Sequence, residues 1–181
     1  MFENYLIVHC ASTLAGIKTA NLFSAPVSSE KNAEEITEKF NSKFQSKNII
    51  MKLLKCNNNK ALFYVYRPEK LSAELNSPEN AEFLRLYGYV NMADTDEYIS
   101  RLATRLKDND FPHEIGLFLG YPLADVKGFI KNKGADYAIC GYWKVYENAD
   151  RAEKIFAKFK KCERIYSDLY KKGVPLEALV A

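Results

Sequence analysis

Residues 49–67 read IIMKLLKCNNNKALFYVYR, and this stretch decides the fold class. Two runs rich in apolar and aromatic residues, 49–56 and 61–67, flank three consecutive asparagines. Asparagine tolerates the left-handed backbone conformation that tight turns require. The stretch therefore predicts an antiparallel β-hairpin whose two runs are its paired strands.

Amphipathic helical patterns lie on both sides of this hairpin. Before it, Ala33, Ile36, Phe40 and Phe44 recur at the spacing of one helix face. After it, proline and capping signals predict five shorter helices, over 68–75, 77–88, 94–106, 113–119 and 123–133. The last and most regular pattern, 150–172, predicts a long helix that docks across the sheet.

Two further stretches have the character of strands. Residues 137–147 are rich in aromatics without a helical period, which predicts a long strand of the same sheet. The apolar run 5–10 can join it as another strand. With no linker or internal repeat, the sequence predicts one α+β domain over residues 1–181, in which amphipathic helices pack on an antiparallel sheet with a central hairpin.

The composition of the chain limits the classes of partner that we expect. The chain carries 26 Lys and Arg against 23 Asp and Glu, and a formal net charge of +3 is too small to indicate a polyanionic partner. No apolar run approaches the roughly 20 residues that cross a bilayer, and the first residues lack the basic start of a secretory signal. We therefore expect a cytoplasmic protein that meets neither membrane nor nucleic acid. Its four cysteines show no C-x-x-C spacing and should be free thiols there.

The pair His9-Cys10 ends the apolar run 5–10 and raises the question of thiol chemistry. On a strand, neighbouring side chains point to opposite faces, so these two cannot act on each other. A catalytic couple would join Cys10 to His113, the second of the two histidines, or His9 to another cysteine. The alternative is an inert cysteine at the end of a buried strand, because cysteine is among the most buried residue types.

His113 and Glu114 fall in the first turn of a predicted helix. There they could supply a base, or Glu114 could simply cap the helix beside an exposed His113. The motif is not H-E-x-x-H, since residue 117 is leucine. A metal held by His9, His113, Glu114 and Cys140 would need four distant segments to converge, so no metal site is assigned and any cofactor is unknown.

The segment CGYWKVY, residues 140–146, has no polar face. A strand covered on both sides explains this pattern, but an aromatic wall for a flat ligand explains it equally. Lys18 follows Gly16 as a possible anion contact, although the surrounding residues do not form a phosphate-binding loop. The candidate binding residues are His9, Lys18, Tyr121, Tyr142, Trp143 and Lys144.

Residues 114–130 have the layout of a DNA-binding helix-turn-helix. Their second helix, however, offers Lys127 as its first basic group and no early Arg, Asn or Gln to read base edges. A structural helical corner is the better interpretation.

Three blocks carry a resemblance to a known family: HCASTLAGIKTANLFS (9–24), FPHEIGLFLGYPLADVKGFI (111–130) and CGYWKVYENADRAEKIFAKFKKC (140–162). Together they resemble an uncharacterised bacterial family, one of the domains of unknown function, over residues 5–170. The resemblance implies no activity or catalytic residue.

Three hypotheses follow for the function. The first is an accessory or binding module that takes a small ligand or a protein partner near His9, Lys18 and His113, where loops and element ends gather. The second is a thiol- or metal-dependent enzyme that uses Cys10 with His113, which requires Cys10 to be exposed in a cleft. The third, DNA binding at 114–130, is disfavoured.

Overall fold

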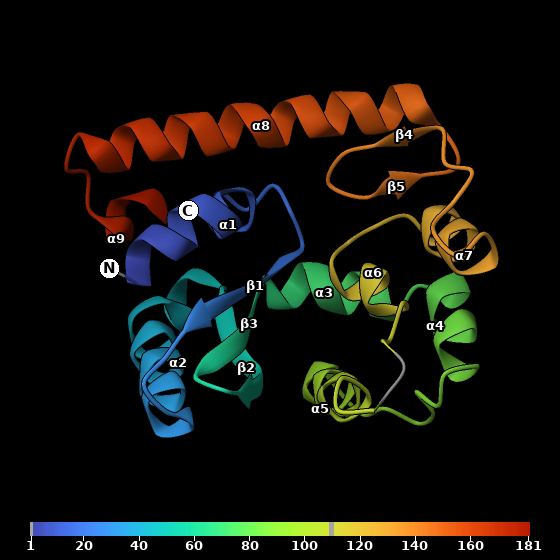
Figure 1. The fold of residues 1–181 in the computed structure, drawn as a ribbon, viewed down its shortest axis with the longest axis horizontal. Helices are drawn as coiled ribbons and strands as arrows, with labels where there is room; N and C mark the ends of the chain where they lie inside the picture. The colour runs from blue at the N-terminus through green and yellow to red at the C-terminus, as the bar shows by residue number, and fades with distance from the viewer. Residues whose placement is uncertain (1, 109–110) are drawn as a thin grey trace.

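The computed structural model describes residues 2–108 and 111–181 (Figure 1). Its elements are, in chain order, α1 (Phe2–Leu14), β1 (Ala20–Pro26), α2 (Glu30–Phe44), the 3-10 turn η1 (Gln45–Lys47), β2 (Ile50–Asn57), β3 (Lys60–Tyr66), α3 (Pro68–Leu75), α4 (Pro78–Arg85), α5 (Thr95–Arg105), α6 (Ile115–Phe118), α7 (Leu123–Lys131), β4 (Ile139–Cys140), β5 (Lys144–Val145), α8 (Ala149–Lys171) and α9 (Leu176–Leu179). The α+β class, with helices packed on a small antiparallel sheet, is confirmed.

The predicted hairpin is confirmed as β2 and β3. Asn58 and Asn59 occupy its turn with φ of 50° and 57°, the left-handed conformation that joins two twisted strands tightly. The sheet has the order β1-β3-β2, and all pairs are antiparallel. The sequence did not predict β1, which pairs with β3 from Ala20 opposite Tyr66 to Pro26 opposite Lys60.

The prediction of a strand over residues 5–10 is wrong, because these residues belong to helix α1. Leu6, Ile7, Cys10 and Leu14 are buried and lie on one helix face, while Val8 is exposed. The run resembles a strand in sequence because apolar residues continue through the exposed position Val8. The strand prediction placed the side chains of His9 and Cys10 on opposite faces. On this helix they do not point in opposite directions.

The central strand β3 is buried on both faces. Phe63 and Val65 face a core built with α1 and α2, whereas Tyr64 and Tyr66 face a second core built with α3, α5 and α6. The hydroxyl of Tyr64 donates to the carbonyl oxygen of Phe118 at 2.6 Å, which fastens α6 to the sheet. The two cores therefore share one strand.

Residues 137–147 do not form the predicted long strand of this sheet. They form the separate small hairpin β4-β5, where Trp143 and Val145 pack against the amino-terminal half of α8. The ring of Phe156 packs against Gly141 on the side where a Cβ would stand, so this close approach requires glycine.

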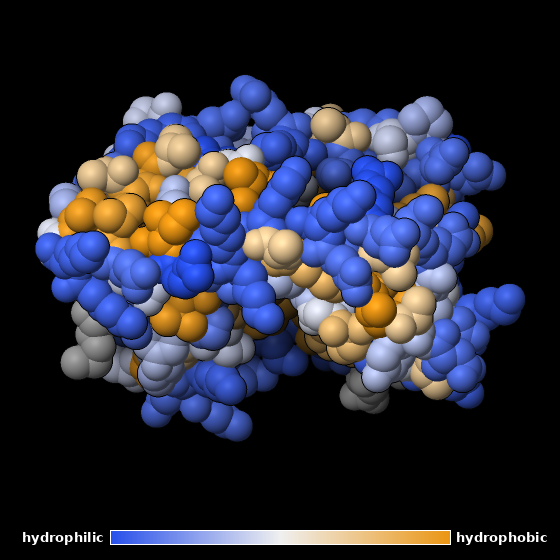
Figure 2. Space-filling view, turned by 90° about the horizontal axis from the view of Figure 1, so that it is seen from above, coloured by the Kyte–Doolittle hydropathy of each residue, from blue (hydrophilic) through white to orange (hydrophobic). Residues whose placement is uncertain are grey.

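Helix α8 does not dock across the sheet as predicted. It packs along α1 at one end and over β4-β5 at the other (Figure 1). The sheet face is already occupied by α1, which leaves α8 in an outer layer. Seen onto α8, hydrophilic side chains cover much of the surface between groups of hydrophobic residues (Figure 2). Lys160 and Lys161 are exposed, as expected for a solvated helix face.

The predicted helix pair 113–119 and 123–133 is confirmed in shortened form as α6 and α7. With four residues, α6 is a single turn, too short for the first helix of a helix-turn-helix. The turn after it contains Gly120 at φ of 76°. No helix among residues 2–108 and 111–181 is long and apolar enough to cross a membrane.

Candidate functional site

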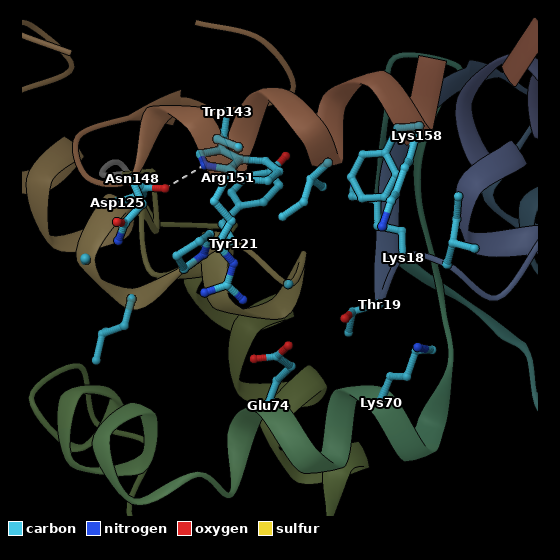
Figure 3. A pocket seen from close by; sticks show the side chains of 18 of the residues that line it. Lys18, Thr19, Lys70, Glu74, Tyr121, Asp125, Trp143, Asn148, Arg151 and Lys158 are labelled. Carbon is cyan, nitrogen blue, oxygen red and sulfur yellow. Dashed lines mark hydrogen bonds between the residues drawn. The ribbon is translucent and has the colours of Figure 1, made fainter. Parts of the chain in front are cut away.

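A cavity of about 680 Å³ opens between α3, the turn joining α6 to α7, the amino-terminal half of α8 and the loop 16–19 (Figure 3). We call it the cleft. Its volume falls within the range of small-molecule sites, roughly 300–1,000 Å³. Among the side chains that line it are those of Lys18, Lys70, Glu74, Tyr121, Trp143 and Arg151.

Basic side chains from three separate parts of the chain enter the cleft. Lys18 comes from the loop after α1, Lys70 from α3, and Arg151 and Lys158 from α8. In Figure 3 the three lysines gather at one end of the cleft, while Arg151 lies with the aromatic residues at the other. Opposing them are Glu74, Asp125 and Glu147, so four basic residues face three acidic ones.

Lys18 is the most unusual of these residues. Its side chain is only 6 % exposed, yet it belongs to none of the ion pairs or side-chain hydrogen bonds found within the described residues. Its Nζ lies 5.5 Å from the centre of the Tyr121 ring. Burial lowers the pKa of Lys18 to about 8, an effect that Cys10 and Glu163 only partly offset.

An aromatic wall stands beside this lysine. The rings of Tyr121 and Trp143 stack with centroids 5.0 Å apart at 27°. Trp143 Nε1 donates to Asp125 Oδ2 at 2.7 Å, which fixes the indole. The other carboxylate oxygen of Asp125 accepts from the backbone N–H groups of Tyr146 at 2.7 Å and Glu147 at 3.1 Å. Asp125 therefore acts as a structural anchor between α7 and the β4-β5 hairpin.

Glu74 enters the cleft from α3. Its side chain is half-buried, and this burial raises the pKa of its carboxyl group although nearby Lys70 acts in the opposite direction. Figure 3 shows Glu74 on the side of the cleft opposite α8, which carries Arg151. A carboxyl group with a raised pKa can exchange protons closer to neutral pH than an ordinary glutamate.

A glycine sets the close approach of two cleft segments. A Cβ at Gly120 would lie 2.6 Å from Oγ1 of Thr19, and the positive φ at this position also disfavours other residues. Gly120 thereby lets the α6–α7 turn contact the loop 16–19. This contact brings Tyr121 over Lys18.

The sequence-predicted binding residues divide among several places. Lys18, Tyr121 and Trp143 meet in the cleft. Lys144 instead lines a second, largely apolar cavity of about 310 Å³ behind the aromatic wall, together with His113. The Nζ of Lys144 is already occupied, because it donates to the carbonyl oxygen of Gly134 at 2.6 Å.

Two more of the predicted binding residues lie outside both cavities. His9 is exposed on α1 and stacks on Phe23, with ring centroids 5.6 Å apart. Tyr142 packs edge-on against Phe159 of α8. These contacts give both side chains a packing role.

Cys10 lies on the buried face of α1 and is completely buried in the core, and this burial raises the pKa of its thiol. His113 is exposed and lies between Phe111 and Phe129. No hydrogen bond joins the thiol and the imidazole in the described part of the chain. The accessible nucleophile that the thiol hypothesis requires is therefore not present at Cys10.

The capping interpretation of Glu114 is also wrong. Glu114 stands at the N-cap position of α6, but its carboxylate makes no capping bond and is fully buried. It pairs instead with Arg105 and accepts from the hydroxyl of Tyr89 at 3.1 Å. A buried carboxylate needs such partners, which the sequence pattern could not reveal.

The alternative metal ligands do not come together. Over residues 2–108 and 111–181, no group of three or more His, Cys, Asp or Glu side chains is arranged to hold a metal ion. The four residues considered as ligands lie in different environments: His9, His113 and Glu114 have the separate contacts given above. Cys140 is exposed on β4.

Sequence reasoning missed Lys70, Glu74, Asp125, Arg151 and Lys158. The only local signal was Asp125, an acidic residue inside an otherwise apolar stretch of α7. The basic residues on α3 and α8 resemble ordinary solvated side chains, because the cleft forms only when these helices meet.

These features define an α+β protein with a basic, aromatic-walled cleft. The chain belongs to DUF3793, a family described as a protein of unknown function, whose model matches residues 6–180. This match confirms the resemblance to a domain of unknown function. No curated protein and no solved structure matches the chain.

Proposed function

We propose that the chain is a binding module for a small anionic ligand that carries a flat ring, and that the cleft holds this ligand. The observation that carries the proposal is Lys18, whose side chain is almost fully buried at the edge of the cleft and forms no ion pair among the described residues. A charge removed from water is costly unless an opposite charge or strong hydrogen-bond acceptors compensate it. A bound anion would supply that partner.

The other basic residues suit the same ligand. Lys70 and Lys158 lie at the Lys18 end of the cleft, and their exposed side chains can move onto a phosphate or carboxylate group. Burial raises the pKa of the Glu74 carboxyl group, so it keeps its proton to a higher pH than an ordinary glutamate. The wall formed by Tyr121 and Trp143 offers a ring face within the same cavity.

Calorimetric titration with adenosine monophosphate (AMP), orthophosphate and adenosine tests this proposal. AMP combines a phosphate group with a flat ring, whereas the other two probes carry one feature each. We expect AMP to bind more tightly than either. If none of the three binds at millimolar concentration, the proposal of an anionic ring ligand is refuted.

Variants locate the binding. Lys18→Met should weaken AMP binding at least about tenfold, because a hydrogen bond to a charged group contributes roughly 1.5–3 kcal/mol. Lys160→Met is the matched control, since Lys160 is exposed on α8 and does not line the cleft. Equal losses in the two variants would indicate nonspecific charge attraction and would contradict the assignment of the cleft.

A further inference from the structure

Lys18 combines three properties that rarely coincide in a lysine. It is 6 % exposed, it takes part in no ion pair of the described residues, and it lines an open cavity. A buried structural lysine normally forms an ion pair with a carboxylate. A lysine that lacks one is suited to act as a neutral amine.

A proton-exchanging group lines the same cavity. Glu74 is half-buried, and its carboxyl oxygens form no hydrogen bond or ion pair within residues 2–108 and 111–181. It enters from α3, whereas Lys18 lies in the loop after α1 (Figure 3). The cleft thus brings an amine and a carboxyl group from distant parts of the sequence to one cavity.

We propose that Lys18 forms an imine with an anionic aldehyde or ketone bound in the cleft, with Glu74 as the group that exchanges protons. The inference rests on the proposed function, since the basic residues must first hold the anionic ligand. It adds that the ligand carries a carbonyl group and is held covalently and reversibly.

The chemistry is balanced without an oxidant or reductant. The nitrogen lone pair of Lys18 attacks the carbonyl carbon, and one proton of the resulting ammonium passes to the carbonyl oxygen to give a neutral carbinolamine. Glu74 then protonates the hydroxyl group, which leaves as water while the C=N bond forms. The protonated imine returns its proton to the Glu74 carboxylate. Hydrolysis reverses the same steps and releases the ligand.

The electrostatics of the site support this step, because only the neutral amine is nucleophilic. With a pKa of about 8, roughly a tenth of Lys18 is neutral at pH 7, against well under a thousandth of an ordinary lysine. Desolvation in an apolar site is a recognised way to activate a lysine in this manner. Here the burial beside the Tyr121 ring supplies it.

Reductive trapping tests the inference. Pyridoxal 5′-phosphate serves as the probe because it has a ring, a phosphate and an aldehyde. The full chain is incubated with it at substoichiometric concentration, reduced with borohydride and mapped by peptide mass spectrometry. We expect labelling of Lys18 at least about tenfold above that of exposed Lys160, given the difference in neutral fraction. Lys18→Arg should keep the charge and lose this label.

Pyridoxine 5′-phosphate, which has a hydroxymethyl group instead of the aldehyde, separates the two proposals. If it binds and protects Lys18 from labelling, both proposals are supported. If it binds in the cleft but the aldehyde labels Lys18 no faster than Lys160, the imine is refuted and anion binding stands. Glu74→Gln should slow labelling without weakening the binding of the alcohol, and an unchanged rate would refute the role of Glu74.

Discussion

Replacing Lys18 by methionine should stabilise the ligand-free protein at neutral pH, which is unusual for the loss of a buried side chain. The change removes a buried ammonium group and keeps an unbranched apolar chain that fills a similar space. Residues that hold a ligand often cost the fold stability when the ligand is absent. The stability of this variant therefore reports directly on whether Lys18 lacks a partner.

The magnitude follows from the pKa. The pKa of Lys18 is about 8 in the fold against an ordinary value of 10.5, and each unit corresponds to about 1.4 kcal/mol. Protonated Lys18 therefore costs the folded state up to about 3 kcal/mol at pH 7. Lost packing offsets part of the gain, so we expect Lys18→Met to raise the free energy of unfolding by about 1–3 kcal/mol.

The lowered pKa of Lys18 also determines how the stability of the protein changes with pH. Because the folded-state pKa is lowered, the unfolded chain binds the Lys18 proton more tightly, and the wild-type stability should rise as pH increases from about 8 toward 10.5. The groups facing Lys18 are the thiol of Cys10, the carboxylate of Glu163 and the ring of Tyr121. The advantage of Lys18→Met should thus be full at pH 7 and shrink at pH 9.5.

Urea denaturation at these two pH values, followed by circular dichroism, measures the effect. Lys160→Met, at an exposed position, should change stability by no more than about 0.5 kcal/mol at either pH. If Lys18→Met is destabilised by 1 kcal/mol or more at pH 7, or if its difference from wild type does not depend on pH, the ammonium is satisfied in the fold and the reasoning fails.

Three further predictions concern the cleft and the core. AMP affinity should fall about tenfold between pH 6.5 and pH 9 as Lys18 loses its proton above about pH 8, and calorimetry with constant affinity across this range would contradict it. Asp125→Ala should lower the free energy of unfolding by about 2–4 kcal/mol, because it leaves Trp143 Nε1 and two backbone N–H groups without their acceptor. The fluorescence of Trp143, the single tryptophan of the chain, measures this loss during urea denaturation. Iodoacetamide should alkylate exposed Cys140 much faster than buried Cys10, and comparable rates by mass spectrometry would show that α1 does not cover the thiol.

The elements that the sequence predicted are those determined locally. The hairpin 49–67 depends on its asparagine turn, and the capping box before α5 depends on Asp94, whose side chain accepts from the N–H of Glu97 at 3.0 Å. Strand β1 lacks such a signal, since its burial does not alternate and its place at the sheet edge comes from pairing with β3. Its recognition required the tertiary partner.

The wrong predictions share one cause. Apolar residues fill nearly every position of 5–10 and of 137–147, so neither segment shows the periodicity that separates helix from strand. The structure covers the first segment with α8 and folds the second against the same helix. Several of these apolar side chains, among them Val8 and Tyr137, are exposed in the fold, so the apolar pattern of neither segment matches its burial.

The candidate site was predictable only in part. Lys18, Tyr121 and Trp143 stood out by residue type, and the structure brings these three to one cleft. Glu74 and Arg151 could not be identified, because each has the appearance of a solvated helix residue and acquires its place through the packing of α3 and α8. The membership of Cys10 in the core likewise follows from α1 being a helix.

The most direct measurement of the central claim is a crystal structure of the protein grown with AMP at pH 7. We expect phosphate oxygens within hydrogen-bond distance of Lys18 Nζ and the adenine ring against the wall of Tyr121 and Trp143. AMP bound elsewhere on the molecule, or a cleft in which Lys18 turns away from the phosphate, would contradict it.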